Sequence, residues 1–198
     1  MKHFKNFKTC VYCTAQTLAS LDETTLARDY AYLEKYVGID KVYLETYRDG
    51  TWVAIDHMKM IQNFFKKHGV EIAGGITTVT PPLEKDDVKR QRLFQTFCYS
   101  NEAMRTYLKK IVTYTAELFD EIILDDFFFT SCTCDDCLRE RSNLSWAEFR
   151  SKKMIDVAEN LILKPAKLAN PSVKVTIKYP NWRESYHETG YVPKIQPS

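Results

Sequence analysis

The feature that most constrains the fold is an alternation of short strand-like runs with longer helical patterns. Five runs are rich in β-branched and aromatic residues and short enough for strands, at 9–14, 41–46, 70–76, 122–126 and 173–178. Between them lie four helical patterns, at 23–36, 56–67, 101–119 and 146–169. Strict alternation predicts parallel strands joined by right-handed crossovers, with helices covering the sheet. The predicted class is therefore α/β.

Residues that are typical of helix ends support the boundaries of these helical patterns. Asp22, Ser100 and Ser145 each stand directly before a helical pattern. A short polar side chain at that position can accept hydrogen bonds from the free backbone N–H groups of the first turn. Gly69 closely follows the second pattern, as expected for a helix end. Pro165 lies inside the last pattern and is expected to kink or split that helix.

Two architectures fit this element order. One is a five-stranded doubly wound sheet complete in itself, and the other is the first five strands of a (β/α)8 TIM barrel, whose usual length is about 250 residues. Loop lengths favour the barrel, because the segments 77–99 and 127–144 after the third and fourth strands are long. The turns at the opposite strand ends, such as 37–40, are short. Barrel enzymes place active sites on the loops after their strands, so we expect function on this long-loop face.

Composition excludes several classes of protein. With 44% hydrophobic and 27% charged residues, the chain is an ordered globular protein, and the lack of a linker or repeat predicts one domain over 1–198. The net charge of +2 argues against a nucleic-acid binder. No run approaches the roughly 20 apolar residues of a membrane span. The basic start is followed by polar residues rather than by the apolar segment of a signal peptide, so localisation stays open.

Two adjacent carboxylates, Asp125 and Asp126, stand where the apolar fourth strand ends. Alternation along the strand is expected to send their side chains to opposite faces, so that only one can be the central catalytic group. A carboxylate on a rigid strand end beside aromatic residues can act as a nucleophile or stabilise a developing oxocarbenium ion. The structural alternative is that the pair caps the next segment or binds backbone amides. We favour function, because two charges at the end of a buried strand are costly without a role.

These residues also carry a resemblance. The run IILDDFFF at 122–129, followed by CTCDDC at 132–137 and later by IKYPNW at 177–182, resembles the poorly characterised bacterial glycoside-hydrolase-like TIM barrels. The resemblance implies a carbohydrate-active (β/α)8 barrel with a catalytic aspartate at the end of the fourth strand. That aspartate is Asp125 or Asp126, and we favour Asp125. It also implies that strands six to eight and a second catalytic carboxylate lie beyond Ser198.

The cysteines indicate a metal site. Cys132, Cys134 and Cys137 form a C-x-C-x-x-C pattern, which suits Zn²⁺ if a fourth ligand arrives from elsewhere. The candidates for that fourth ligand are Cys10, Cys13, Asp135 and Asp136. A closed, thiolate-rich site braces a loop and leaves no position for a reacting water, so the expected zinc is structural and catalysis needs no cofactor. Free buried thiols or a disulfide are the alternatives.

Two further strand ends suit a sugar ligand. After the second strand, Glu45 and Arg48 could hold hydroxyl groups, with Tyr47 or Trp52 as a stacking surface. The alternative there is an ion pair of Arg48 with Glu45 or Asp49. After the fifth strand, the expected substrate contacts are Lys178, Tyr179 and Trp182. The alternative at that end is a turn at Pro180, with the tryptophan covering the core.

The sequence thus predicts a glycoside hydrolase whose partner is a carbohydrate and whose catalysis uses carboxylates at the barrel mouth. A noncatalytic carbohydrate-binding protein, or a zinc-braced α/β protein, is the second hypothesis. A barrel cut after five strands exposes the edges of its first and fifth strands, and unpaired edges invite self-association. We therefore expect dimers or low solubility.

Overall fold

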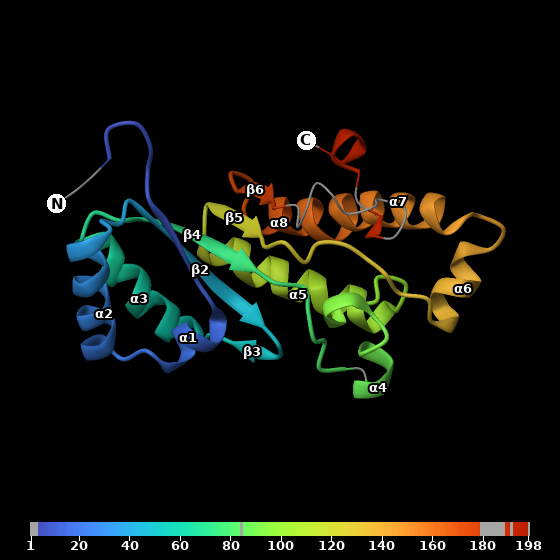
Figure 1. Cartoon of the computed structure of the whole chain (residues 1–198), viewed down its shortest axis with the longest axis horizontal. Coiled ribbons are helices and arrows are strands. Elements are labelled where there is room, and N and C mark those ends of the chain that lie inside the picture. Colours follow the sequence, from blue (N-terminus) through green and yellow to red (C-terminus); the bar gives the residue numbers. More distant parts are fainter. Residues whose placement is uncertain (1–3, 84, 179–188, 191, 198) are drawn as a thin grey trace.

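The structure is a computed structural model that describes residues 4–83, 85–178, 189–190 and 192–197. Its strands are β1 (Cys10–Cys13), β2 (Lys41–Arg48), β3 (Thr51–Trp52), β4 (Glu71–Ile76), β5 (Glu121–Leu124) and β6 (Lys174–Ile177). Its α-helices are α1 (Ala15–Ser20), α2 (Glu23–Tyr36), α3 (Ile55–Lys67), α4 (Asp86–Lys89), α5 (Glu102–Leu118), α6 (Asp135–Arg141), α7 (Trp146–Asp156) and α8 (Lys164–Ala169). A π-helical stretch, η2 (Val157–Leu163), joins α7 to α8, and two short 3₁₀ turns are η1 (Leu93–Gln95) and η3 (Pro193–Ile195). The predicted α/β class is confirmed (Figure 1).

One six-stranded sheet organises the chain. Its order is β1-β2-β4-β5-β6, all neighbours are parallel, and β3 pairs antiparallel with β2. Apart from β3, each described strand lies beside the one that precedes it in the sequence, so the strand order does not reverse. The carboxyl ends of five strands therefore meet at one edge. The loops 77–101 and 125–134, which follow β4 and β5, start from that edge.

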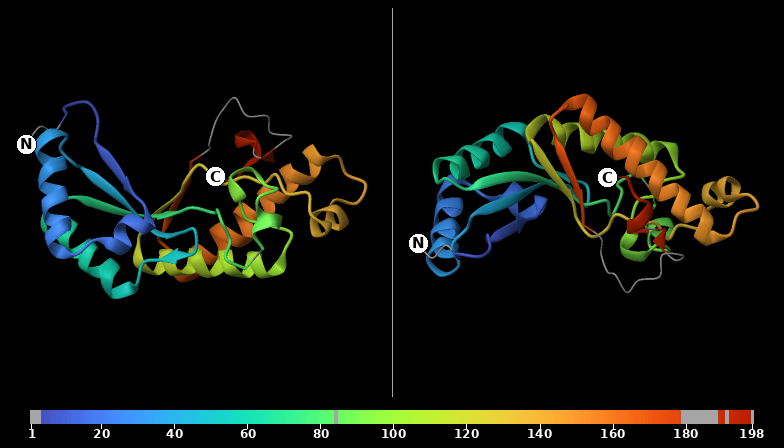
Figure 2. Two further views of the ribbon diagram at one scale, coloured as in Figure 1. Left: turned by 60° about the horizontal axis from the view of Figure 1, so that its bottom comes forward. Right: turned by 90° about the horizontal axis from the view of Figure 1, so that it is seen from above.

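The two faces of the sheet differ, and two glycines of β4 show how. A Cβ atom on Gly74 would lie 2.7 Å from the side chain of Thr115 on α5. A Cβ atom on Gly75 would lie 2.6 Å from the hydroxyl of Tyr12 on β1. Successive strand residues point to opposite faces, so α5 packs on one face, the helix face, and Tyr12 lies on the other, the inner face. Figure 2 shows α3 and α5 along the same side of the sheet.

The helix face carries the hydrophobic core. Leu44 of β2 packs there with Met58 and Ile61 of α3. Further along the sheet, Leu124 of β5 packs with Leu108 of α5 and with residues of η2 and α8. Each such buried side chain contributes about 1.5–3 kcal/mol relative to its exposed state. None of the helices in the described ranges is long and apolar enough to cross a membrane.

Helix caps explain where several elements begin, with one correction. Asp22 and Ser145 cap α2 and α7 with capping boxes, as expected. The cap of α5 is Asn101 and not Ser100, because the Asn101 side chain accepts the Met104 backbone N–H. The expected helix around Pro165 is divided: the π-helical stretch η2 separates α7 from α8, and Pro165 lies in the first turn of α8. The strand β3 and helices α1, α4 and α6 were not predicted, because such short elements carry little periodic pattern.

Candidate functional site

Polar side chains from four strand ends meet at the carboxyl edge of the sheet. We call them the mouth group, and its members are Glu45, Arg48, Thr77, Asp125, Asp126 and Lys178. Two come from β2, and the others follow β4, β5 and β6. The group stands on the long-loop face, where function was expected.

Glu45 is the buried anchor of the mouth group. Its side chain has no solvent exposure and accepts hydrogen bonds from Arg48 Nε at 2.9 Å, the Tyr12 hydroxyl at 2.8 Å and the Ala15 backbone N–H at 2.7 Å. The Thr77 hydroxyl donates to it as well. A carboxylate with this many donors is satisfied within the protein. The ion pair of Arg48 with Glu45 is thus present, and Glu45 offers no free oxygen to a sugar.

Asp125 lies between two cations. Its Oδ2 accepts from Arg48 Nη2 at 3.1 Å, and its Oδ1 accepts from Lys178 Nζ at 3.0 Å. The same Lys178 amine lies 3.2 Å from Asp126 Oδ2. The expectation that the two aspartates point to opposite faces is therefore wrong: β5 ends at Leu124, and strand alternation no longer applies in the turn that follows. The Asp125 side chain is 12% exposed and that of Asp126 is 34% exposed, so solvent reaches both.

The surroundings of Asp125 fix its charge. Burial by itself would raise the pKa of Asp125. The hydrogen bond from Lys178, the Asp126 backbone N–H and the positive charges of Lys178 and Arg48 outweigh burial, so the pKa of Asp125 lies below its usual value. Asp125 is consequently ionised at neutral pH. An ionised carboxylate suits a nucleophile or a stabiliser of positive charge, and it cannot serve as a proton donor.

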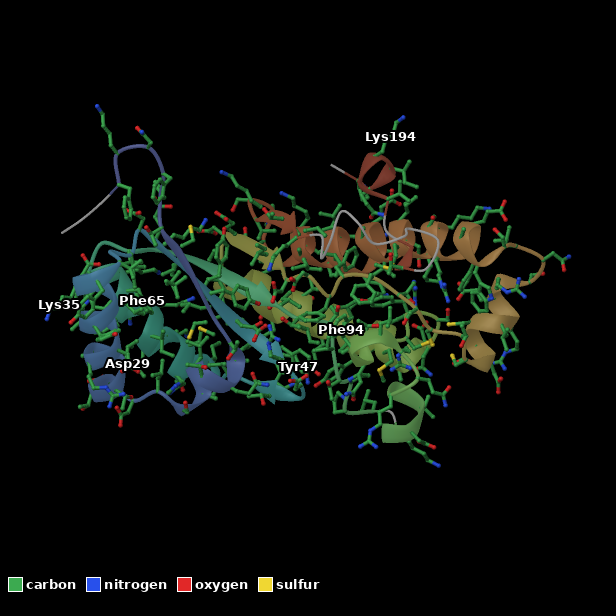
Figure 3. The ribbon with its side chains drawn as sticks, in the orientation of Figure 1. Asp29, Lys35, Tyr47, Phe65, Phe94 and Lys194 are labelled. Carbon is green, nitrogen blue, oxygen red and sulfur yellow. The ribbon has the colours of Figure 1, made fainter. Side chains whose placement is uncertain are left out.

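Three aromatic rings, Phe94, Phe127 and Phe129, adjoin the mouth group and are called the aromatic wall; Phe94 was not expected from the sequence. Phe94 is 64% exposed, and its ring centroid lies 5.4 Å from that of Phe127 and 6.2 Å from that of Phe129. The Arg48 guanidinium lies 5.9 Å from the Phe127 ring centroid. The exposed ring of Phe94 therefore lies next to Phe127, which contacts Arg48, and Arg48 in turn binds Asp125. Phe94 stands in a mostly polar loop, away from any strand pattern, and Figure 3 labels its side chain.

Tyr47 and Trp52 do not join the mouth group. Tyr47 is fully buried, and the indole N–H of Trp52 donates to the Tyr107 hydroxyl of α5 at 2.8 Å. Both rings thus pack on the helix face. The reason is a register shift of β2 against β4 between Glu45 and Tyr47, which breaks the two-residue alternation and turns Tyr47 away from the inner face. The expected contacts Tyr179 and Trp182 lie outside the described residues.

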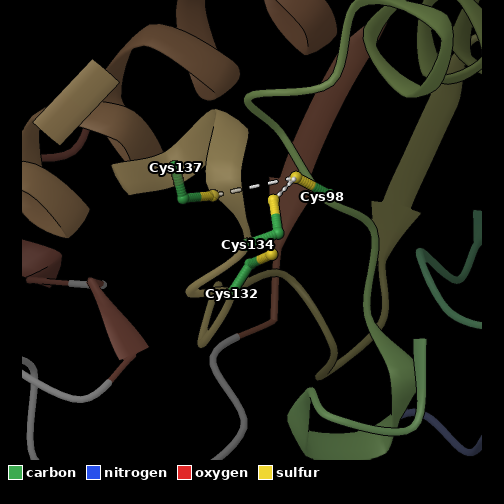
Figure 4. Close-up of side chains that lie close together, drawn as sticks. All are labelled: Cys98, Cys132, Cys134 and Cys137. Carbon is green, nitrogen blue, oxygen red and sulfur yellow. Dashed lines mark hydrogen bonds between the residues drawn. The ribbon is translucent and has the colours of Figure 1, made fainter. Parts of the chain in front are cut away.

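Four cysteines form a second cluster. The sulfur atoms of Cys98, Cys132, Cys134 and Cys137 all lie within 4.8 Å of one another, and the group could hold a metal ion (Figure 4). Three of these side chains are buried and Cys134 is half-buried. Hydrogen bonds from Cys137 and Cys98 lower the pKa of Cys132, which favours its thiolate.

The fourth member of the cluster is Cys98, whereas the candidates from the sequence were Cys10, Cys13, Asp135 and Asp136. Both of those cysteines lie on β1, and Cys13 packs against the core of the helix face. Among the described residues, the group of close sulfur atoms includes neither of them. Cys98 stands alone in the sequence, far before the C-x-C-x-x-C run, so no spacing pattern could indicate it.

Comparisons with known proteins agree with the character of the mouth group. A family model described as "Probable glycosyl hydrolase, catalytic domain" matches residues 1–198. An uncharacterized protein of the archaeon Saccharolobus solfataricus is 32% identical over 210 aligned residues, which cover 94% of this chain and 34% of that protein. The chain thus spans about a third of the length of this relative. No solved structure matches the chain.

Proposed function

The chain belongs to the family of probable glycosyl hydrolase catalytic domains, and on that premise we propose that it hydrolyses glycosidic bonds of an oligosaccharide or polysaccharide at the mouth group. The observation that supports this most is Asp125, a carboxylate at the carboxyl edge of a parallel sheet, held between Arg48 and Lys178 and still reached by solvent. Its lowered pKa keeps it ionised, as a nucleophile or a stabiliser of an oxocarbenium ion must be.

The roles of the other polar residues follow from their contacts. Glu45 is a positioning residue, because its buried carboxylate holds the Nε side of the Arg48 guanidinium while Nη2 reaches Asp125. Glycoside hydrolysis also needs a proton donor. Among the described residues, a candidate for that donor is Asp126, which is the more exposed aspartate. Carboxylates and water suffice for the bond cleavage, so this proposal assigns no cofactor to it.

Sugar binding would use the aromatic wall and the two more exposed members of the mouth group, Lys178 and Asp126. Phe94 and Phe127 offer an apolar surface for the C–H face of a pyranose, and Lys178 and Asp126 offer a donor and an acceptor for hydroxyl groups. Tyr179, which directly follows Lys178 in the sequence, and Trp182, which lies shortly after it, remain proposed substrate contacts. The metal that the four cysteines could hold is proposed to be a structural zinc ion that takes no part in the reaction.

We propose that the sheet represents the first five β/α units of a (β/α)8 barrel. A doubly wound sheet needs a point at which the strand order reverses, and the described strands keep their sequence order. In addition, the inner face is polar and partly exposed. There, Lys41 Nζ lies 2.6 Å from Glu121 Oε1, and Tyr12 stacks on Tyr43. Such a face suits the lining of a barrel more than a surface covered by a second helix layer.

One observation favours a second candidate, a noncatalytic carbohydrate-binding protein. Glu45 and Asp125 already have cationic partners, and a closed network of this kind also serves as a scaffold. Substitution of the aspartates distinguishes the two candidates.

The test is turnover of nitrophenyl glycosides, and release of reducing ends from polysaccharides, by the purified protein. Replacing Asp125 by Asn should lower kcat at least about 100-fold, because the group that meets the transition-state charge is lost. Asp49→Asn is the matched control, since Asp49 is exposed in the β2–β3 turn and its side chain accepts a hydrogen bond from Gln16, outside the mouth group. Asp126→Asn shows whether Asp126 is the proton donor.

The result that contradicts the hydrolase is wild-type turnover by the Asp125→Asn variant with its fold intact. Binding of an oligosaccharide without turnover by the unsubstituted protein would instead establish the second candidate. Far-ultraviolet circular dichroism of each variant separates loss of chemistry from loss of fold.

A further inference from the structure

The four-cysteine cluster joins two loops that both belong to the mouth. Cys98 lies in the loop 77–101 after β4, whereas Cys132 and Cys134 lie in the loop 125–134 after β5 and Cys137 lies in α6, which follows that loop. Their separations match a metal centre. Four sulfur atoms at about 2.3 Å from a tetrahedral zinc ion lie about 3.8 Å from one another, and Cys98 Sγ lies 3.6 Å from Cys134 Sγ and 3.7 Å from Cys137 Sγ. A disulfide would need about 2.05 Å.

The chemistry of the donors selects the ion. Four thiolates are soft ligands that favour Zn²⁺ or iron in tetrahedral geometry, and they leave no open position for substrate. Four thiolates around Zn²⁺ carry a net charge of −2, which is costly to bury without a counter-charge. Arg92 is itself buried, and its Nη1 lies 3.9 Å from Cys132 Sγ. The cluster thus has a cation in place for its excess negative charge.

The loop that carries Cys98 cannot easily hold its shape alone. Thr80, Phe94 and Gln95 all have φ near +50°, a region that costs a non-glycine residue free energy and persists only where the surroundings enforce it. The apolar cluster around the cysteines is small, and its buried members apart from cysteine are Met104 and Phe149. Such a small core supplies little stability without a cross-link or a metal.

Further contacts join the same two loops between the cysteine cluster and the mouth group. The Leu93 backbone N–H donates to Ser131 Oγ at 2.9 Å, and Thr78 Oγ1 donates to the Phe127 carbonyl at 2.9 Å. Phe94 packs on Phe127 beside them. Every one of these contacts joins the loop after β4 to the loop after β5, as the cysteines do.

We infer that a structural Zn²⁺ bound by Cys98, Cys132, Cys134 and Cys137 fastens the loop after β4 to the loop after β5, and thereby holds Phe94 against Phe127 at the edge of the mouth. The metal site and the connection between the loops are inferred from the positions of the cysteines and from the contacts between the two loops, independently of the proposed function. Only the significance of that edge for sugar binding rests on the proposed function.

The first experiment measures metal in the purified chain, by elemental analysis and by cobalt substitution. We expect about one zinc ion per chain, and Co²⁺ should give the intense visible bands of a tetrahedral thiolate site. Cys98→Ser should weaken Zn²⁺ binding at least about 100-fold, because loss of a direct ligand costs more than loss of an outer-shell partner. Cys13→Ser is the matched control and should bind zinc as the unsubstituted chain does.

Three outcomes overturn the metal site: no uptake of Zn²⁺ or Co²⁺ by the reduced chain, stoichiometric iron in place of zinc, or disulfides among the four cysteines in a thiol titration of the denatured protein. Each is measured on the unsubstituted chain, so the test holds even where Cys98→Ser does not fold.

The second experiment compares backbone hydrogen exchange before and after removal of zinc by a chelator under reducing conditions. Segments 92–100 and 127–137 should exchange at least about tenfold faster without the metal, whereas β2, which lies in the core of the sheet, should keep its protection. Equal exchange of both segments with and without zinc would overturn the fastening role. Glycosidase assays do not enter either experiment, so failure here is distinct from failure of the proposed hydrolase.

Discussion

Two cations that differ in exposure help to lower the pKa of Asp125. Arg48 is held from behind by buried Glu45, whereas Lys178 reaches in from the end of β6 with half of its side chain in solvent. Removing Arg48 would leave Glu45 buried without its cation, which damages the fold as well as the site. Lys178 is therefore the better residue for a test of the electrostatics.

We predict that Lys178→Met costs less than about 1 kcal/mol of unfolding free energy at neutral pH, because an exposed ion pair is screened by solvent. The cost should depend on pH in a defined direction. The folded pKa of Asp125 is lowered, so its stabilisation is complete above the unfolded value of about 3.9 and is lost as pH falls through the folded pKa. The difference between unsubstituted protein and variant should thus shrink in acid.

Urea unfolding at a series of pH values from about 6 down to about 2.5 measures this difference. In an Asp125→Asn background, the same lysine substitution should cost less at neutral pH, since Asp126 is then its one remaining ionic partner among the described residues. A lysine effect that is constant over the whole pH range, or unchanged by Asp125→Asn, contradicts the assigned pair.

Single residues were predictable from the sequence where a strand pattern pointed to them. Asp125, Asp126, Arg48 and Lys178 stand at strand ends, and the structure brings all four together. The positions of site residues that lie in long loops could not be predicted from the sequence. Phe94 and Cys98 belong to a loop whose path depends on contacts with a second loop, and sequence spacing holds no trace of such contacts.

At the scale of elements, β1, β2 and β4 are coupled through one close approach. Gly75 of β4 lies under Tyr12 of β1, whose hydroxyl donates to Glu45 of β2. We predict that Gly75→Ala displaces Tyr12 and breaks this hydrogen bond, at a cost of about 1–3 kcal/mol. Tyr12→Phe should then cost less in the Gly75→Ala background than alone, because the hydrogen bond is already lost.

Gly74→Ala serves as the control for this cycle. Its Cβ would press on Thr115 and Phe119 on the helix face, so it should also destabilise the protein. Its effect should add to that of Tyr12→Phe within about 0.5 kcal/mol, since the two changes lie on opposite faces of the sheet. Urea unfolding of the single and double variants provides the numbers. The prediction is contradicted if the effects of Tyr12→Phe and Gly75→Ala add as fully as those of Tyr12→Phe and Gly74→Ala. The absence of a side chain at Gly75 would then have no bearing on the hydrogen bond between Tyr12 and Glu45.

Element boundaries were well predicted for long, periodic segments. The helix expected at 23–36 is α2 with the same bounds, and the five expected strands all form. The shift between Glu45 and Tyr47 in β2 was not predictable, because period-two alternation looks regular in the residues themselves. That shift depends on the pairing with β4, which is a property of the sheet and not of one strand. It accounts for the misplacement of Tyr47.

At the scale of the whole molecule, the described sheet has two edges, β1 and β6. Along β6, the N–H groups of Lys174 and Lys178 donate to carbonyls at Asp120 and Leu124, beside and within β5, both at 2.9 Å. Alternation then directs the N–H of Val175 to the other side, away from β5. No strand within the described residues pairs with this side of β6, and an unpaired strand edge is a template for pairing with another chain.

We therefore predict that the chain self-associates through β6, and that Val175→Pro reduces this association. Proline removes the outward N–H and is tolerated at a sheet edge. Lys174→Pro is the matched control, because it removes the N–H that bonds to Asp120 and so weakens the β5–β6 pairing itself. Sedimentation or light scattering over a range of concentrations should show dimers for the unsubstituted chain and fewer for Val175→Pro. The lysine variant should lose stability, without the same specific loss of dimers.

Two outcomes contradict this prediction. A chain that stays monomeric at high concentration would mean that the β6 edge does not pair. Dimers that are unaffected by Val175→Pro would mean that association uses another surface.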